Sequence, residues 1–233
     1  MGETEAWVRT EAQALNPWIS MWTKPRATIR QIVAADPRRL VLALAAVAGI
    51  SEGFDIASNA REFLDVTILP AVLSFAAVSG AILGICGLYI CAAVVRWTGI
   101  WIGGQASSLH IRAAIAWSRL PVVWIAPLWL PMTALYGQEL FTDKAPALDA
   151  TVAGQPAMAL SLLCFYLAGF VAELWSFFLL LKSLGEVQGF SAWKALGNLI
   201  LASLLICLAV FVLVIVSIIV VGALINFDYD TWL

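Results

Sequence analysis

Five long apolar stretches, separated by short polar segments, constrain the fold of this chain more than any other sequence feature. They fall at about residues 40–59, 67–95, 113–136, 157–182 and 197–225. Each is long enough to cross the hydrocarbon core of a bilayer, which takes about 20 residues of α-helix. Charged residues make up only 12% of the chain, whereas about 25% is typical of a soluble domain. The sequence therefore predicts an all-α, polytopic integral membrane protein with five transmembrane helices.

The basic residues predict the orientation, because short loops rich in Lys and Arg stay in the cytoplasm. With the N-terminus inside, all but two of the 13 Lys and Arg residues lie on the inner side. The two exceptions are Arg61 and Lys144. Five crossings then place the C-terminus outside. We predict a cytoplasmic segment at 1–39, a membrane domain at 40–225 and a short outer tail at 226–233.

Residues 18–37 are predicted to form an amphipathic helix on the cytoplasmic membrane surface. Thr23 can cap it, and Pro25 lies close to the first turn, where a missing N–H costs little. The apolar residues at 29, 32 and 33 fall on one face and the basic residues at 26 and 30 on another, with two tryptophans just upstream. This pattern is typical of an anchor at headgroup level. The alternative is a soluble helix packed on the inner loops. The anchor residues are Trp18, Trp22, Arg26, Ile29, Arg30, Ile32 and Val33.

Proline makes the third apolar stretch irregular. Pro121, Pro127 and Pro131 stand close together and alternate with tryptophans. Each proline removes a helical hydrogen bond and favours a kink unless neighbouring groups satisfy the freed carbonyl. Such kinks either line a cavity or serve packing, and the sequence leaves both readings open.

Glu173 is the strongest single candidate for a functional residue, because it is an acidic residue well inside the fourth apolar stretch. At 1.5 Å per helical residue it is about 13 Å from the inner end, and Arg119 enters the third stretch to about 10 Å from the same side. These depths allow a Glu173–Arg119 pair. In the functional interpretation, this pair relays a proton or another ion. The structural reading is a buried ion pair, or a protonated Glu173 hydrogen-bonded to a neighbour.

Glu52 and Asp55 form a second polar pair, just past the middle of the first apolar stretch. They are three residues apart and so share a helix face. Two interpretations follow: an outward-facing cation site, or a polar helix end that leans toward the outer interface.

Two small-xxx-small pairs concern packing rather than chemistry. They are Gly49 with Gly53 and Gly80 with Gly84. Missing side chains at this spacing let helix backbones approach closely. The pairs therefore favour tight helix–helix contacts.

The sequence carries no known catalytic signature, such as GxSxG, HExxH or a phosphate-binding GxxxxGK[ST]. His110 is the single histidine, and the four cysteines all lie inside apolar runs, so we expect no metal site and no cofactor. The net charge is −2, and no basic tract offers a nucleic-acid footprint. We expect neither catalysis nor nucleic-acid binding.

Three stretches of the chain resemble bacterial members of the Ypt-interacting-protein (Yip) domain family. They are the segment from Asn16-Pro17-Trp18 to Asp36-Pro37, the segment 113–121 entering the third span, and the segment 185–196 before the fifth. The likeness runs from about residue 16 to 225. It implies a five-span protein of the bacterial inner membrane with a cytoplasmic N-terminus.

Eukaryotic members of that family act in vesicle traffic and bind prenylated small GTPases and partner membrane proteins. The short N-terminal region here, and the lack of a match to their acidic-aromatic loop motif, argue against GTPase binding. The expected partners are the lipid bilayer and other membrane proteins or a second copy of this chain. We therefore expect a non-enzymatic membrane protein that acts by such association, in membrane organisation or trafficking. The alternative is a small transporter or channel that uses the kinked third span and Glu173.

Overall fold

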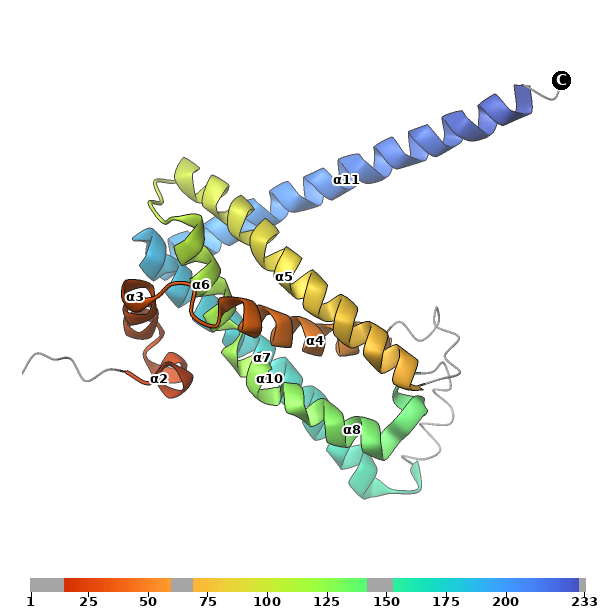
Figure 1. Ribbon diagram of the computed structural model, residues 1–233, viewed down its shortest axis with the longest axis horizontal. Helices are drawn as coiled ribbons and strands as arrows, with labels where there is room; N and C mark the ends of the chain where they lie inside the picture. Colours follow the sequence, from red (N-terminus) through yellow and green to blue (C-terminus); the bar gives the residue numbers. More distant parts are fainter. Residues whose placement is uncertain (1–14, 60–68, 142–152, 231–233) are drawn as a thin grey trace, which may run out of the picture.

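The computed structural model describes residues 15–59, 69–141 and 153–230, and these residues form an all-helical protein (Figure 1). The predicted all-α fold class is confirmed. The α-helices are α2 (Pro17–Thr23), α3 (Pro25–Ala35), α4 (Val41–Asn59), α5 (Leu69–Trp101), α6 (Ser108–Ser118), α7 (Leu120–Ile125), α8 (Trp129–Tyr136), α10 (Pro156–Gln188) and α11 (Ala192–Asp230). Two 3₁₀ segments, η2 (Ala126–Leu128) and η3 (Gly137–Phe141), flank α8.

Four helices, α4, α5, α10 and α11, are each long and apolar enough to cross a membrane. The α6 helix and the segment from α7 to α8 pass the same test together, but they are bent by 40° at the break between them. The described residues thus hold four candidate spans, or five if the bent pair counts as one. Both α5 and α10 have 33 residues, so each is about 50 Å long and exceeds the hydrocarbon core of about 30 Å.

The α4 and α5 helices pack backbone against backbone at the predicted glycines. A Cβ atom built on Gly84 would lie 2.5 Å from the carbonyl oxygen of Ala45 and 2.8 Å from the Cα atom of Gly49. Gly53 and Gly80 are equally crowded by the opposite helix. The close packing predicted for the small-xxx-small pairs is therefore confirmed.

The N-terminal segment forms two helices instead of one. The side chain of Asn16 caps α2 by accepting a hydrogen bond from the Trp18 backbone N–H at 3.1 Å. The break falls at Lys24, because a proline disfavours helical geometry in the residue before it. The α3 helix then begins at Pro25, with Lys24 instead of Thr23 as its N-cap residue.

The apolar face of α3 is covered by protein, which corrects the lipid-facing role expected for Ile29 and Ile32. Ile29 is fully buried and Ile32 is 5% exposed, and both belong to a core that includes Trp117. Trp22 and Val33 pack at the edge of this core, and Trp18 meets the Trp117 ring edge-on at 5.8 Å. Arg26 is exposed, and Arg30 pairs with Glu186 at 2.7 Å. The apolar face of α3 therefore packs on other helices of the protein.

The α11 helix packs on the other helices up to about Ala202 and then projects away from them (Figure 1). Its anchor is a buried polar contact: the Thr98 hydroxyl donates to the Asn198 side-chain carbonyl at 2.6 Å, and the Asn198 amide donates to the Val95 carbonyl at 3.0 Å. No residue of the apolar window of α11 is buried inside the described structure.

Candidate functional site

Arg119 bridges two carboxylates from two different spans. Its guanidinium donates to Glu173 of α10 through Nη1 at 2.8 Å and through Nη2 at 3.1 Å. The same Nη2 also contacts Glu52 of α4. Two-point pairing of this kind is the stronger geometry for an Arg–carboxylate pair, because two parallel N–H···O bonds fix the planes of both groups. The structure thus joins α4, the bent span and α10 through one cation.

The local sequence explains why Arg119 can reach both partners. Arg119 lies at the break between α6 and α7, where Pro121 occupies the first turn of the new helix. Its side chain is only 24% exposed, whereas those of Glu52 and Glu173 are about half exposed on the isolated chain. The guanidinium is therefore the more buried partner in both ion pairs.

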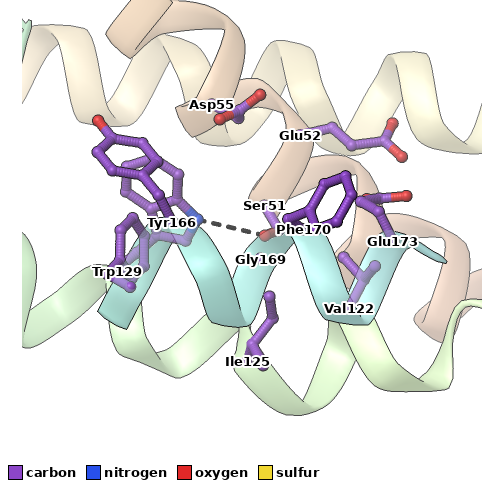
Figure 2. Close-up of a pocket in the computed structure, with 11 residues that line it drawn as sticks. Ser51, Glu52, Asp55, Val122, Ile125, Trp129, Tyr166, Gly169, Phe170 and Glu173 are labelled. Carbon is purple, nitrogen blue, oxygen red and sulfur yellow. Dashed lines mark hydrogen bonds between the residues drawn. The ribbon is translucent and has the colours of Figure 1, made fainter. Parts of the chain in front are cut away.

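A pocket of about 260 Å³ extends from these carboxylates along α10. Figure 2 shows Glu52 and Glu173 at one end of it and the rings of Trp129 and Tyr166 at the other. Asp55 lines the pocket one turn beyond Glu52. The pocket and its ion pairs thus combine three carboxylates with one guanidinium, which is a formal excess of two negative charges.

The bent span forms one wall of this pocket. Val122, Ile125 and Trp129 line it, and the Trp129 indole N–H donates to the Ser51 hydroxyl of α4 at 3.2 Å (Figure 2). The lining residues come from α7, from the residue before η2, and from the start of α8, so the irregular helix is what presents them to one cavity. Residues of the irregular segment thus line a cavity, and two of them, Val122 and Trp129, are also buried in the apolar core.

The three prolines differ in what they do locally. Pro121 starts α7 and Pro127 falls in η2, so each coincides with a change of helix. Pro131 lies in the first turn of α8, which continues to Tyr136 without interruption. A proline in a first helical turn costs no hydrogen bond, because that N–H has no partner within the helix. The kinks expected at Pro121 and Pro127 thus coincide with breaks, whereas the kink expected at Pro131 does not.

The sequence predicts Glu52 and Asp55 as a site separate from Glu173 and Arg119. In the structure the three carboxylates line one pocket, and Arg119 pairs with Glu52 and Glu173. At 1.5 Å per residue, Glu52 is about 18 Å from the start of the first apolar stretch, within about one helical turn of the depth of Glu173, about 13 Å. This similarity in depth is the feature of the sequence that indicates one shared site for Glu52 and Glu173. The aromatic wall formed by Trp129, Tyr166 and Phe170 had no separate signal, because aromatic residues are common throughout the spans.

The chemistry available at this pocket is that of carboxylates and one guanidinium. Over the described residues, no group of three or more His, Cys, Asp and Glu side chains is arranged to hold a metal ion. Carboxylates that open into a cavity inside a span can bind a proton or a cation, and ionisable groups at such depth are candidates for function.

The fold and the site together define a polytopic helical membrane protein with an ion-pair cluster that links its candidate spans. The sequence matches the model of the Yip1 domain over residues 19–215, and the chain belongs to the Yip1 domain family. Members of this family are not known as enzymes. Neither a curated protein nor a solved structure matches the chain.

Proposed function

We propose that this protein is a non-enzymatic membrane protein that acts by associating with other membrane proteins, or with a second copy of itself, in membrane organisation or trafficking. The observation that carries the proposal is the exposure of α11. Half of the apolar window of α4 is buried inside the protein, whereas none of the window of α11 is. Helices in lipid associate through van der Waals packing and interhelical hydrogen bonds. Among the four candidate spans of the described residues, α11 has the least buried apolar window and so offers its face for such packing.

The proposed setting is a bacterial inner membrane, with the N-terminus in the cytoplasm and the C-terminus outside. The distribution of Lys and Arg supports it, because basic loops are retained in the cytoplasm. Lys24, Arg30, Lys182 and Lys194 flank or lie on elements at the end of the bundle where α2, α3 and the α10–α11 connection meet. The division into segments 1–39, 40–225 and 226–233 belongs to the same proposal.

The native cysteines allow a direct test of association through α11. Cys207 lies on the exposed part of α11, and Cys164 is exposed on α10. Two variants are prepared in native membranes, each retaining only one of these cysteines, and are treated with a short bifunctional maleimide. We expect a cross-linked dimer, or a cross-link to another membrane protein, from the Cys207 variant and a much weaker one from the Cys164 variant. A strict monomer in mild detergent, with no cross-link at Cys207, would contradict the proposal.

The pocket favours a second candidate function, a small transporter or channel. Its carboxylates open into a cavity of about 260 Å³ between α4, α7 and α10. The formal excess of negative charge at the site would be balanced by a proton or a monovalent cation. The bent span is interrupted between Ser118 and Leu120 and forms one wall of the pocket. In a transporter, this wall would be the part that moves.

Liposome flux separates the two candidates. The purified chain is reconstituted with a pH-sensitive dye inside the vesicles, and a K⁺ or H⁺ gradient is imposed. Transport would give flux that falls with Glu173→Gln, which keeps the shape of the side chain but removes its charge. Glu186→Gln is the matched control, because Glu186 lies on the same helix outside the pocket. Absence of flux from the unmodified chain removes this candidate.

A further inference from the structure

A second pocket, of about 630 Å³, lies between the N-terminal helices and α10. Its lining combines basic and aromatic side chains and includes no Asp or Glu. Lys24 and Arg26 come from the α2–α3 junction, and Lys182 comes from the end of α10. A pocket that gathers three cations from distant parts of the chain is complementary to an anion.

These three cations have no counter-charge within the described residues. Arg30, one turn from Arg26, pairs with Glu186, and Arg119 pairs with two carboxylates. Lys24, Arg26 and Lys182 form no ion pair with any residue that the structure describes. The ammonium group of Lys182 lies 5.2 Å from the centre of the Phe178 ring. The positive charge of the pocket is therefore free to act on a ligand.

The backbone adds to this positive potential. No side chain caps the N-terminus of α3, which begins at Pro25 inside the pocket lining. The first amide groups of an uncapped helix carry a partial positive charge.

The walls of the pocket indicate where the anion comes from. Trp175, Phe178 and Lys182 lie on one face of α10, at a spacing of three and four residues, and all three line the pocket. The rings of Trp175 and Phe178 are stacked at 5.6 Å and remain exposed on the isolated chain. Lys182 ends the apolar stretch of this span, so the cations lie at the membrane boundary and the rings lie deeper. A soluble phosphate would use only the cations, whereas a phospholipid would use both parts.

We propose that this pocket binds one anionic phospholipid of the surrounding bilayer. Lys24, Arg26 and Lys182 hold the phosphate and its headgroup, and an acyl chain lies against Trp175 and Phe178. A zwitterionic headgroup fits less well, because its own ammonium group meets three cations that have no carboxylate among them. Basic pockets at the cytoplasmic ends of membrane helices are a known way of holding such headgroups.

The test is lipid binding to the full chain in detergent, followed by native mass spectrometry. The protein is titrated with phosphatidylglycerol or phosphatidylcholine of identical acyl chains. We expect the first phosphatidylglycerol to bind about tenfold more tightly, since each Lys or Arg near an anionic lipid contributes measurably. The triple variant Lys24→Gln, Arg26→Gln, Lys182→Gln should lose this preference.

The matched control is the triple variant Arg38→Gln, Arg39→Gln, Arg96→Gln, which removes the same charge from exposed residues outside the pocket. It should keep the preference. Equal loss in both triple variants, or no preference in the unmodified chain, would overturn the proposal. Excess inorganic phosphate should not displace the lipid, and displacement would refute the assignment to a phospholipid.

Single substitutions keep the test decisive if the triple variant does not fold. Lys182→Gln is compared with Lys194→Gln, because Lys194 also lies over a phenylalanine ring, that of Phe190 at 4.4 Å. Lys194 is exposed and outside the pocket. The preference should weaken only with Lys182→Gln and persist with Lys182→Arg. The same weakening with Lys194→Gln would show diffuse attraction instead of a site.

Discussion

Replacing Gly84 with alanine should separate α4 from α5 and destabilise the protein. The added methyl group would lie 2.5 Å from the Ala45 carbonyl oxygen and 2.8 Å from the Gly49 Cα atom, whereas ordinary contacts begin at 3.4 Å. Both obstacles are backbone atoms, so no side chain can rotate away. The two helices must therefore move apart by about 1 Å, and overpacking of this kind typically costs about 1–3 kcal/mol.

Gly87→Ala is the matched control for this substitution. Gly87 lies three residues further along the same helix, and a Cβ atom built there meets nothing within 4 Å. Both substitutions gain the same intrinsic helix propensity, at most about 1 kcal/mol. The difference between the two variants then isolates the steric cost, and we expect Gly84→Ala to be less stable by about 1–3 kcal/mol.

The assay is reversible unfolding in mixed micelles, in which the fraction of sodium dodecyl sulfate is raised and helix content is followed by circular dichroism. Gly84→Ala should unfold at a lower fraction of the denaturing detergent than Gly87→Ala. Identical unfolding midpoints would refute the reasoning, because they would show that the α4–α5 crossing yields without loss of stability.

Three further substitutions test other contacts. Ile29→Asp should lower the melting temperature in detergent strongly, because it buries a charge that has no partner; unchanged stability with weaker liposome binding would instead favour a lipid-facing Ile29. Asn198→Leu should cost about 1–3 kcal/mol, because Thr98 and a backbone carbonyl lose their partner, and hydrogen exchange should rise at the start of α11 and not in α4. Arg119→Gln should destabilise the protein by leaving two carboxylates facing each other, and adding Glu173→Gln should recover part of that loss in a double-mutant cycle.

The sequence predicts the helical type of the membrane elements well because the bilayer imposes one physical rule on all of them. A span must satisfy its backbone internally, so an apolar run of sufficient length becomes a helix. The ends of the helices are less predictable, because helical backbone hydrogen bonding continues beyond the last apolar residues. The α10 helix, for example, extends to Gln188, six residues past the apolar stretch that predicted it.

The sequence predicts the apolar face of a helix more easily than whether lipid or protein covers that face. Ile29 and Ile32 form the expected stripe on α3, but Trp117 and its neighbours cover them instead of lipid. Lipid tails and a protein core are equally apolar, so a helical pattern cannot distinguish them. Only the positions of the other helices decide, and these depend on contacts far apart in the sequence.

The α4 helix shows why the ion pairs and the fold depend on each other. A carboxylate near the centre of a span raises the free energy of membrane insertion by about 2.5–3.5 kcal/mol. The larger apolar residues of this short helix lower it by a similar amount. Its insertion alone is therefore near balance, and the contact of Glu52 with Arg119 supplies a favourable term that the helix lacks on its own. Arg119 in turn would be an unpaired cation between the helices without its two carboxylates. The break before Pro121 places the guanidinium where α4 and α10 both reach it. The cluster of Arg119, Glu52 and Glu173 thus supports the packing of α4 and also forms the charged end of the pocket. A change in the charge of Glu52 or Glu173 should therefore alter how α4 and α10 pack.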